Sequence, residues 1–205
     1  PAKVMVLGGG VSGTHAAEMA VGMRADVTLF DISPARLEEL DVQFDGKLKT
    51  VFSTHHAVAE ALADADLVIG CVLLPGAAAP KLVKREDLKR MRKGSVLVDV
   101  AIDQGGCFET SHATTHSDPT YIVDGIVHYC VANMPGAVAR TSSQALNHAT
   151  LPYVLALAAK GWRRALADDA GFAAGLNVHA GRITHAAVAA ALGANCLPMA
   201  SALAA

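Results

Sequence analysis

Short apolar runs alternate with segments of helical composition over the first half of this chain. Strands buried on both faces read as continuous apolar runs, and parallel strands need long crossovers, which are usually helices. The alternation therefore predicts an α/β fold with a doubly wound parallel sheet covered by helices on both faces. The predicted strands are 3–7, 26–31, 48–53, 67–74 and 95–102, and the predicted helices are 13–23, 33–44, 55–65 and 85–91. Residues 120–138 are predicted to form one more sheet segment followed by a loop.

Composition fits such a core and excludes several classes of protein. Apolar residues make up 52% of the chain and aromatic residues 4%, so the core must consist of aliphatic side chains and alanine. No run approaches the roughly 18 apolar residues of a membrane-spanning helix, and the N-terminus lacks the pattern of a signal peptide, which predicts a cytoplasmic protein. The net charge is −2, and the basic cluster at 81–93 is interleaved with acids, so we expect neither nucleic acid nor a membrane as partner.

Three glycines follow the first predicted strand in the spacing G-x-G-x-x-G. Gly8, Gly10 and Gly13 stand where the chain enters its first helix, and such glycines permit a tight turn and bring a pyrophosphate to the helix N-terminus. Asp31 ends the next strand, 18 residues after Gly13, where a carboxylate can bind an adenosine ribose. This context predicts a Rossmann-like site. The alternative is a glycine-rich turn with an aspartate that caps the next helix.

The two side chains beside the predicted ribose site indicate which dinucleotide is bound. The charge of Asp31 would repel a 2′-phosphate, which favours NAD over NADP. Arg36 follows closely, and it is either a residue that accommodates such a phosphate or an ordinary surface residue of the next helix.

Ligands of doubly wound sheets lie across the carboxyl ends of the strands. Three segments follow such ends, namely 70–76, 98–109 and 128–138. The most suggestive residue is Asp103, because Gly105 and Gly106 after it allow close backbone approach. It is a candidate site residue, or else it caps a turn.

Several segments closely resemble L-alanine dehydrogenases. They include VLGGGVSG, VTLFD, VLVDVAIDQGGCFE, HYCVANMPGAV and ATLPYVLALAAKGW, in order along the chain. The related transhydrogenase alpha subunit shares much of this region but is less similar around Asp103. The resemblance implies reversible oxidative deamination of L-alanine to pyruvate and ammonia, with NAD as cofactor.

The same resemblance assigns roles to individual residues. Asp103 would be catalytic, ordering water and relaying protons, and Asn133 would fix the nicotinamide end. His112 stands where the family often has an arginine. The implied cofactor-binding residues are Gly8, Gly10, Val11, Ser12, Gly13, Asp31, Arg36, Ser53, Val72, Leu73, Val100, Ala101, Ile102, Asp103, Val131, Ala132, Asn133 and Met134.

The resemblance also divides the chain into domains. Residues 1–142 would form the dinucleotide-binding domain, and 143–205 would return to a substrate domain whose N-terminal part, with a lysine, an arginine and a catalytic histidine, is absent from this sequence. A long apolar helix over 143–162 would then expose an apolar face, and the tail from Asp168 would carry one short helix. The family implies a homohexamer. The alternative function is a non-catalytic NAD-binding module or a transhydrogenase-like subunit.

Other chemistries are weakly supported. His112 and His116 have helical spacing near Cys107, but their segment suits a loop and offers no fourth ligand, so we expect no metal site. The four cysteines form no CxxC pair, which predicts reduced, buried thiols, with a reactive Cys107 as the less favoured alternative. The nucleophile motif G-x-S-x-G is absent.

Overall fold

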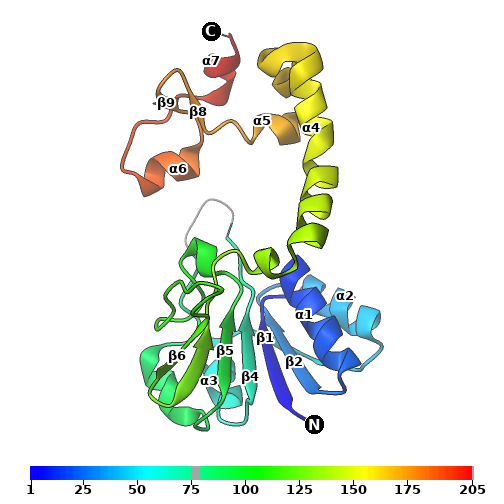
Figure 1. The fold of residues 1–205 in the computed structure, drawn as a ribbon, viewed down its shortest axis with the longest axis vertical. Coiled ribbons are helices and arrows are strands. Elements are labelled where there is room, and N and C mark those ends of the chain that lie inside the picture. Colours follow the sequence, from blue (N-terminus) through cyan, green and yellow to red (C-terminus); the bar gives the residue numbers. More distant parts are fainter. Residues whose placement is uncertain (75–78, 205) are drawn as a thin grey trace. The chain divides into compact units, whose positions relative to one another are not determined.

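A computed structural model describes residues 1–74 and 79–204 (Figure 1). Its contacts divide the chain into two units, Pro1–Met134 and Pro135–Ala205. The division that we predict at residue 142 concerns membership of a substrate domain, and it stays a prediction.

The first unit is built around a sheet of seven strands in the order β3-β2-β1-β4-β5-β7-β6. All neighbouring strands are parallel except β6 and β7. The chain moves outward from β1 to β3, then returns to place β4 on the other side of β1, so the order confirms a doubly wound sheet. The strands are Lys3–Leu7 (β1), Asp26–Asp31 (β2), Lys49–Phe52 (β3), Leu67–Gly70 (β4), Val96–Asp99 (β5), Thr120–Val123 (β6) and Ile126–Tyr129 (β7).

Helices cover both faces of the sheet. The first face carries α1 (Val11–Gly22) and α2 (Pro34–Phe44), and the second carries α3 (His55–Ala61) and the 3-10 helix η1 (Arg85–Arg90). Ser33 caps α2 as its sequence predicts, since its hydroxyl accepts a hydrogen bond from the Arg36 N–H. The predicted helix at 85–91 is present as the 3-10 turn η1.

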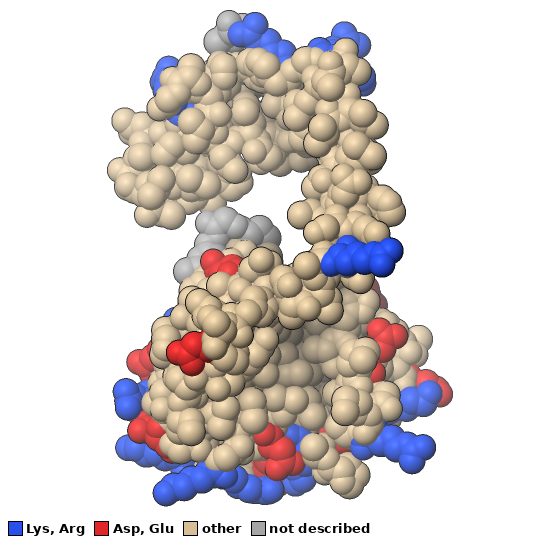
Figure 2. Space-filling view, viewed as in Figure 1, with Lys and Arg blue, Asp and Glu red and all other residues tan. Residues whose placement is uncertain are grey.

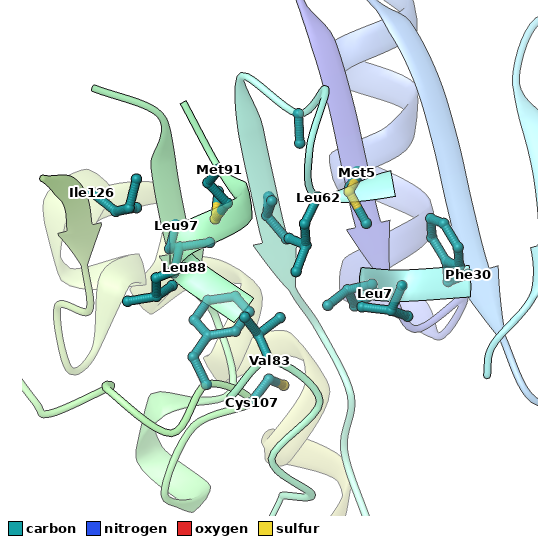
Figure 3. Packing of buried hydrophobic residues seen from close by; sticks show 14 of the residues in the cluster. Met5, Leu7, Phe30, Leu62, Val83, Leu88, Met91, Leu97, Cys107 and Ile126 are labelled. Atoms are coloured by element: carbon teal, nitrogen blue, oxygen red, sulfur yellow. The ribbon is translucent and has the colours of Figure 1, made fainter. Parts of the chain in front are cut away.

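Two apolar cores result, one on each face. Strand β1 supplies both, because alternate side chains of a strand point to opposite faces. Val4 and Val6 pack with α1 and α2 in one core, and Met5 and Leu7 pack in the other. Figure 3 shows the second core, which continues through Leu97 to Ile126.

The predicted strands 67–74 and 95–102 are shorter in the structure and end at Gly70 and Asp99, and residues 120–138 differ in their arrangement. Residues 120–138 do not form a single sheet segment followed by a loop, because β6 and β7 fold as an antiparallel hairpin. Asp124 and Gly125 form its turn with φ values of 52° and 87°. Two successive positive φ values are typical of a type I′ hairpin turn, for which Asp-Gly is a preferred sequence.

The second unit is led by α4 (Ala139–Ala167), with Pro152 inside it. Gly161 interrupts the helical geometry with φ 71° and ψ 161°, so α4 consists of two helices joined at a kink. The tail contains more structure than predicted: three short helices and a two-stranded sheet replace the single helix. These are α5 (Ala170–Ala173), α6 (Ala186–Ala191), α7 (Met199–Ala204), β8 (Val178–His179) and β9 (Arg182–Ile183).

Much of α4 is apolar and exposed. Leu146, Val154 and Leu155 have exposed fractions of 65%, 55% and 58%. Residues 141–159 contain no Asp, Glu, Lys or Arg, and Figure 2 shows no charged side chain along the middle of this helix. No helix that the structure describes is both long enough and apolar enough to cross a membrane.

Candidate cofactor site

The glycine turn joins β1 to α1 in a space too small for other side chains. Gly8 has φ +100°, and a Cβ atom there would lie 2.9 Å from Cγ2 of Val72. A Cβ atom on Gly13 would lie 1.8 Å from the carbonyl oxygen of Gly8. The first turn of α1 therefore packs directly on the strand end, as a dinucleotide-binding turn requires.

Gly10 differs from its neighbours because it faces open space. It is the N-cap of α1 with no side-chain cap, and a Cβ atom there would meet no atom within 4 Å. Val11 and Ser12 after it are exposed. The N–H groups of a first helical turn have no partners within the helix and carry partial positive charge, so this end suits an anionic group. The residues present fit a pyrophosphate.

Asp31 lies at the end of β2 and is hydrogen-bonded to the glycine turn. Its Oδ2 accepts a hydrogen bond from the Gly9 N–H at 2.7 Å, and its Oδ1 accepts one from the Ser33 N–H at 2.9 Å. A carboxylate offers about four lone-pair sites, so Asp31 keeps capacity for a sugar hydroxyl. The structure brings Asp31 to the turn, and its contact with a ribose stays a prediction.

Arg36 reaches back from α2 to the same turn. Its Nε donates to the carbonyl oxygen of Gly9 at 2.7 Å and its Nη2 to the Thr14 hydroxyl at 2.9 Å. Its Nη1 pairs with Glu39 at 2.8 Å. These contacts were not predicted. Through them Arg36 stabilises the glycine turn, so its side chain is not a free surface side chain.

Other predicted cofactor residues lie at the carboxyl ends of neighbouring strands. Val72 is half-buried and Leu73 is 60% exposed after β4. The predicted segment 70–76 extends past them to residues that lie outside the described part of the chain. Ser53 follows β3, and its N–H donates to the Asp31 carbonyl at 2.9 Å, which places it beside the predicted ribose site.

Asp103 lies in the 3-10 turn η2 (Ile102–Gln104) after β5. Its side chain is exposed, and among the described residues it has no hydrogen-bond or ion-pair partner. Before it, Val100 and Ala101 are half-buried and Ile102 is buried. The carboxylate is thus free to meet a ligand.

The segment after β7 carries the other predicted nicotinamide-side residues. Val131 is buried, Ala132 and Met134 are half-buried, and Asn133 is exposed with φ +56°. The Asn133 carbonyl accepts a hydrogen bond from Nε2 of His116 at 3.0 Å.

His112 lies in an irregular segment and does not share a helix with His116. Its ring stacks on Tyr121 with centroids 3.7 Å apart. A contact between His112 and the cofactor stays untested.

Sequence reasoning missed Asp99, whose side chain is fully buried at the end of β5. Its carboxylate accepts hydrogen bonds from the N–H groups of Cys107 at 2.8 Å and Phe108 at 3.3 Å, and from the Ser111 hydroxyl. Gly106 permits this approach, since a Cβ atom there would lie 2.5 Å from Oδ2 of Asp99. The available signal was an acid inside the apolar run VLVDV.

A second buried polar group, His128, belongs to β7. Thr110 donates to Nε2 of His128 at 2.7 Å, while Nδ1 of His128 donates to the Ile126 carbonyl at 3.0 Å. Burial lowers the pKa of His128, which favours this neutral form. The Tyr121 hydroxyl donates to the Thr110 carbonyl at 2.9 Å, and burial raises the pKa of Tyr121.

The cysteines are free thiols, and three of the four are buried as expected. Burial raises the pKa of both Cys71 and Cys107 to about 12, which supports the unreactive alternative for Cys107. Cys196 is exposed, so the prediction was wrong for it, because the tail around it has no large core. Within residues 1–74 and 79–204, no cluster of three potential metal ligands occurs.

Comparison with known proteins agrees with these features. Over 193 residues the chain is 66% identical to the alanine dehydrogenase of Halomonas elongata, a match that covers 94% of this chain and 52% of that protein. It is 54% identical to the alanine dehydrogenase of Staphylococcus haemolyticus, covering 93% and 52%. The chain thus spans about half the length of the curated relatives it matches.

Solved structures give the same result. An L-alanine dehydrogenase structure aligns with a TM-score of 0.84 at 52% identity, covering 94% of this chain and 53% of that one. A transhydrogenase from Sinorhizobium meliloti aligns with a TM-score of 0.63 at 33% identity, covering 70% and 42%. The model of the family "Alanine dehydrogenase/PNT, C-terminal domain" matches residues 1–186. The chain belongs to this family.

Proposed function

We propose that this chain is the NAD-binding part of an alanine dehydrogenase. The observation that carries the proposal is the open helix N-terminus at Gly10 beside the Asp31 carboxylate. The reaction is L-alanine + NAD⁺ + H₂O ⇌ pyruvate + NH₄⁺ + NADH + H⁺, in which the bound cofactor accepts the hydride from the alanine Cα.

The residues of this chain bind and orient. The first-turn N–H groups of α1 neutralise the pyrophosphate, with Gly8, Gly10 and Gly13 letting it approach and Val11 and Ser12 lying under it. Asp31 accepts hydrogen bonds from the adenosine ribose, and its charge disfavours a 2′-phosphate. Ser53 lies toward the adenine.

Two segments, Val100 to Asp103 and Val131 to Met134, would hold the nicotinamide half, and Val72 and Leu73 would line the cofactor. Asn133 fixes the nicotinamide end. Asp103 is exposed and unpartnered in the described structure, so it is free to order the attacking water and to hold and release its protons.

The substrate domain requires more chain than this sequence contains. The matched relatives are about twice as long, and we propose that their additional half supplies the groups that bind the alanine carboxylate. The exposed apolar side chains of α4 support this arrangement, because an unpaired apolar helix face normally marks an interaction surface. A pocket of about 370 Å³ in the second unit is lined by Leu157, Trp162, Leu166, Phe172, Leu176 and Val178, among others, and offers a further apolar surface.

Binding is the first test. We expect the purified chain to bind NAD⁺ and NADH in a calorimetric titration, with much weaker binding of NADP⁺. Failure of the folded chain to bind either form of NAD would contradict the proposal.

Turnover needs a fusion of this chain behind the N-terminal half of the Halomonas elongata enzyme. We expect the fusion to form NADH from L-alanine at alkaline pH and the chain alone to form none. If the chain binds NAD but the folded fusion is inactive, the second candidate is favoured, namely a transhydrogenase-like or non-catalytic NAD-binding module. The similarity to the transhydrogenase structure supports this candidate.

Assembly and location are part of the same proposal. We also propose a homohexamer and a cytoplasmic location, which the family resemblance implies. Sedimentation of the fusion would test the first, and fractionation of cells the second.

A further inference from the structure

The segment that follows Asp103 is held against the protein along its whole length. Its four successive carbonyl groups, from Gln104 to Cys107, all accept hydrogen bonds from residues 79–82. The Ala79 N–H donates to Gln104 O at 2.9 Å, and the Leu82 N–H donates to Cys107 O at 2.7 Å. Between them, the Lys81 Nζ donates to the carbonyl oxygens of both Gly105 and Gly106.

The opposite side of the segment is held by Asp99. Its carboxylate accepts hydrogen bonds from the N–H groups of Cys107 and Phe108 and from the Ser111 hydroxyl. Three donors on one fully buried carboxylate satisfy a charge that would otherwise be costly to bury. The segment is therefore clamped between a lysine that binds its carbonyl groups and an aspartate that binds its N–H groups.

The segment includes two glycines whose backbone would be flexible without these hydrogen bonds. Gly105 and Gly106 have φ values of +89° and +78°, and glycine has the largest conformational freedom to lose. Neither Asp99 nor Lys81 belongs to the predicted cofactor contacts. Their partners begin at Gly105, two residues after Asp103. The side chain of Asp103 itself has no hydrogen-bond or ion-pair partner among the described residues.

We propose that Asp99 and Lys81 are positioning residues, which fix the backbone after Asp103 and thereby set where the Asp103 carboxylate stands beside the bound substrate. The inference rests on the proposed function for the role of Asp103. Displacing a catalytic group by roughly 1 Å can lower the reaction rate about 100-fold. Loss of the contacts made by Asp99 or Lys81 should therefore have a measurable effect on kcat.

The first test uses the chain itself. In Asp99→Asn, the charge that binds the two N–H groups is lost, and we expect hydrogen exchange of the Cys107 and Phe108 amides to accelerate at least about 10-fold relative to the β1 amides. Asp41→Asn is the matched control, since Asp41 is exposed on α2 and its side chain has no partner among the described residues. Unchanged exchange in Asp99→Asn would overturn the clamp whatever the activity of the fusion.

The second test uses the fusion described above. Lys81→Met removes an exposed lysine and should leave the fold intact, with Lys47→Met as its control. We expect Asp99→Asn and Lys81→Met each to lower kcat about 10- to 100-fold with less than a 3-fold change in the KM for NAD⁺.

A double-mutant comparison separates positioning from general damage. In an Asp103→Ala background, the residual rate should hardly respond to either substitution, because there is no carboxylate left to position. Equal losses in both backgrounds, or full kcat in both single variants, would overturn the inference. An inactive unaltered fusion would count against the proposed function, and the exchange measurement would still decide whether Asp99 holds the segment.

Discussion

Oδ2 of Asp31 accepts a hydrogen bond from the Gly9 N–H at 2.7 Å, and this bond joins the side chain at the end of β2 to the glycine turn after β1. The carboxylate that is predicted to bind the ribose also holds the turn that is predicted to bind the pyrophosphate. Substitution of Asp31 should therefore affect both halves of the binding site.

We expect Asp31→Ala to weaken NADH binding about 10- to 100-fold, which corresponds to the ~1.5–3 kcal/mol of hydrogen bonds to a charged group. It should also narrow the preference for NAD over NADP, since the repelling charge is gone. Calorimetric titration of both cofactors measures this, with Asp41→Ala as control. Unchanged NADH affinity would refute the ribose assignment.

Gly10 and Gly13 should respond differently to alanine. A Cβ atom on Gly13 would lie 1.8 Å from Gly8 O, so Gly13→Ala should lower the free energy of unfolding by more than about 3 kcal/mol. Gly10→Ala meets open space, so it should cost less than about 1 kcal/mol of stability and still weaken NADH binding, because the methyl group takes the place of the pyrophosphate.

Gly22→Ala, at the far end of α1 and also facing open space, is the control for Gly10→Ala: it should leave NADH binding unchanged and raise the free energy of unfolding by no more than about 1 kcal/mol. Denaturant unfolding and NADH fluorescence titration measure the two effects. A Gly10→Ala variant that binds NADH normally would argue against the pyrophosphate site.

His128 predicts how stability depends on pH. Its pKa in the folded chain is lowered from 6.5 by burial, so the unfolded chain takes up the proton first as the pH falls. The contribution of the neutral ring is complete above pH 6.5 and is lost as the pH falls from there through the folded-state pKa. The temperature midpoint of thermal unfolding should therefore decrease when the pH is lowered from 7.5 to 5.

Because the chain has nine histidines, the comparison with a His128→Gln variant isolates the contribution of His128. The variant should be less stable at pH 7.5 and should show a smaller decrease on acidification. Parallel midpoint curves for the two proteins would show that His128 is not the group responsible.

The thiols should divide into two classes. Cys71, Cys107 and Cys130 are buried, and burial raises the pKa of each. A thiol reagent at pH 8 should modify Cys196 rapidly and the others only after unfolding. Cys196→Ser should remove the fast phase, and a fast phase that persists in this variant would locate a reactive buried cysteine.

The strands that the sequence predicted well are those whose boundaries are set locally. The runs 3–7 and 26–31 match β1 and β2 residue for residue, since each apolar run ends at a glycine or an aspartate. The hairpin of β6 and β7 was missed although its Asp-Gly turn was visible, because 120–138 was interpreted as one segment. The alanine- and glycine-rich tail offers no apolar period that would distinguish its short helices.

The candidate site divides in the same way. The glycine turn and Asp31 follow from spacing within one strand–helix–strand unit. Asp99 and Lys81 could not be identified from local spacing. The partners of Asp99 lie 8 to 12 residues away and those of Lys81 lie 24 to 25 residues away, in an irregular segment. Their roles depend on the packing of two loops, which no local pattern encodes.

The central place of β1 has a consequence for synthesis on the ribosome. One edge of β1 pairs with β2, which begins at Asp26. The other edge can pair only after β4, which begins at Leu67, has been synthesised. At about 5–20 residues per second, several seconds separate the two events. During that time an apolar strand has an unpaired edge, the kind that recruits other chains. We expect a pause in translation between these strands to raise the fraction of aggregated product.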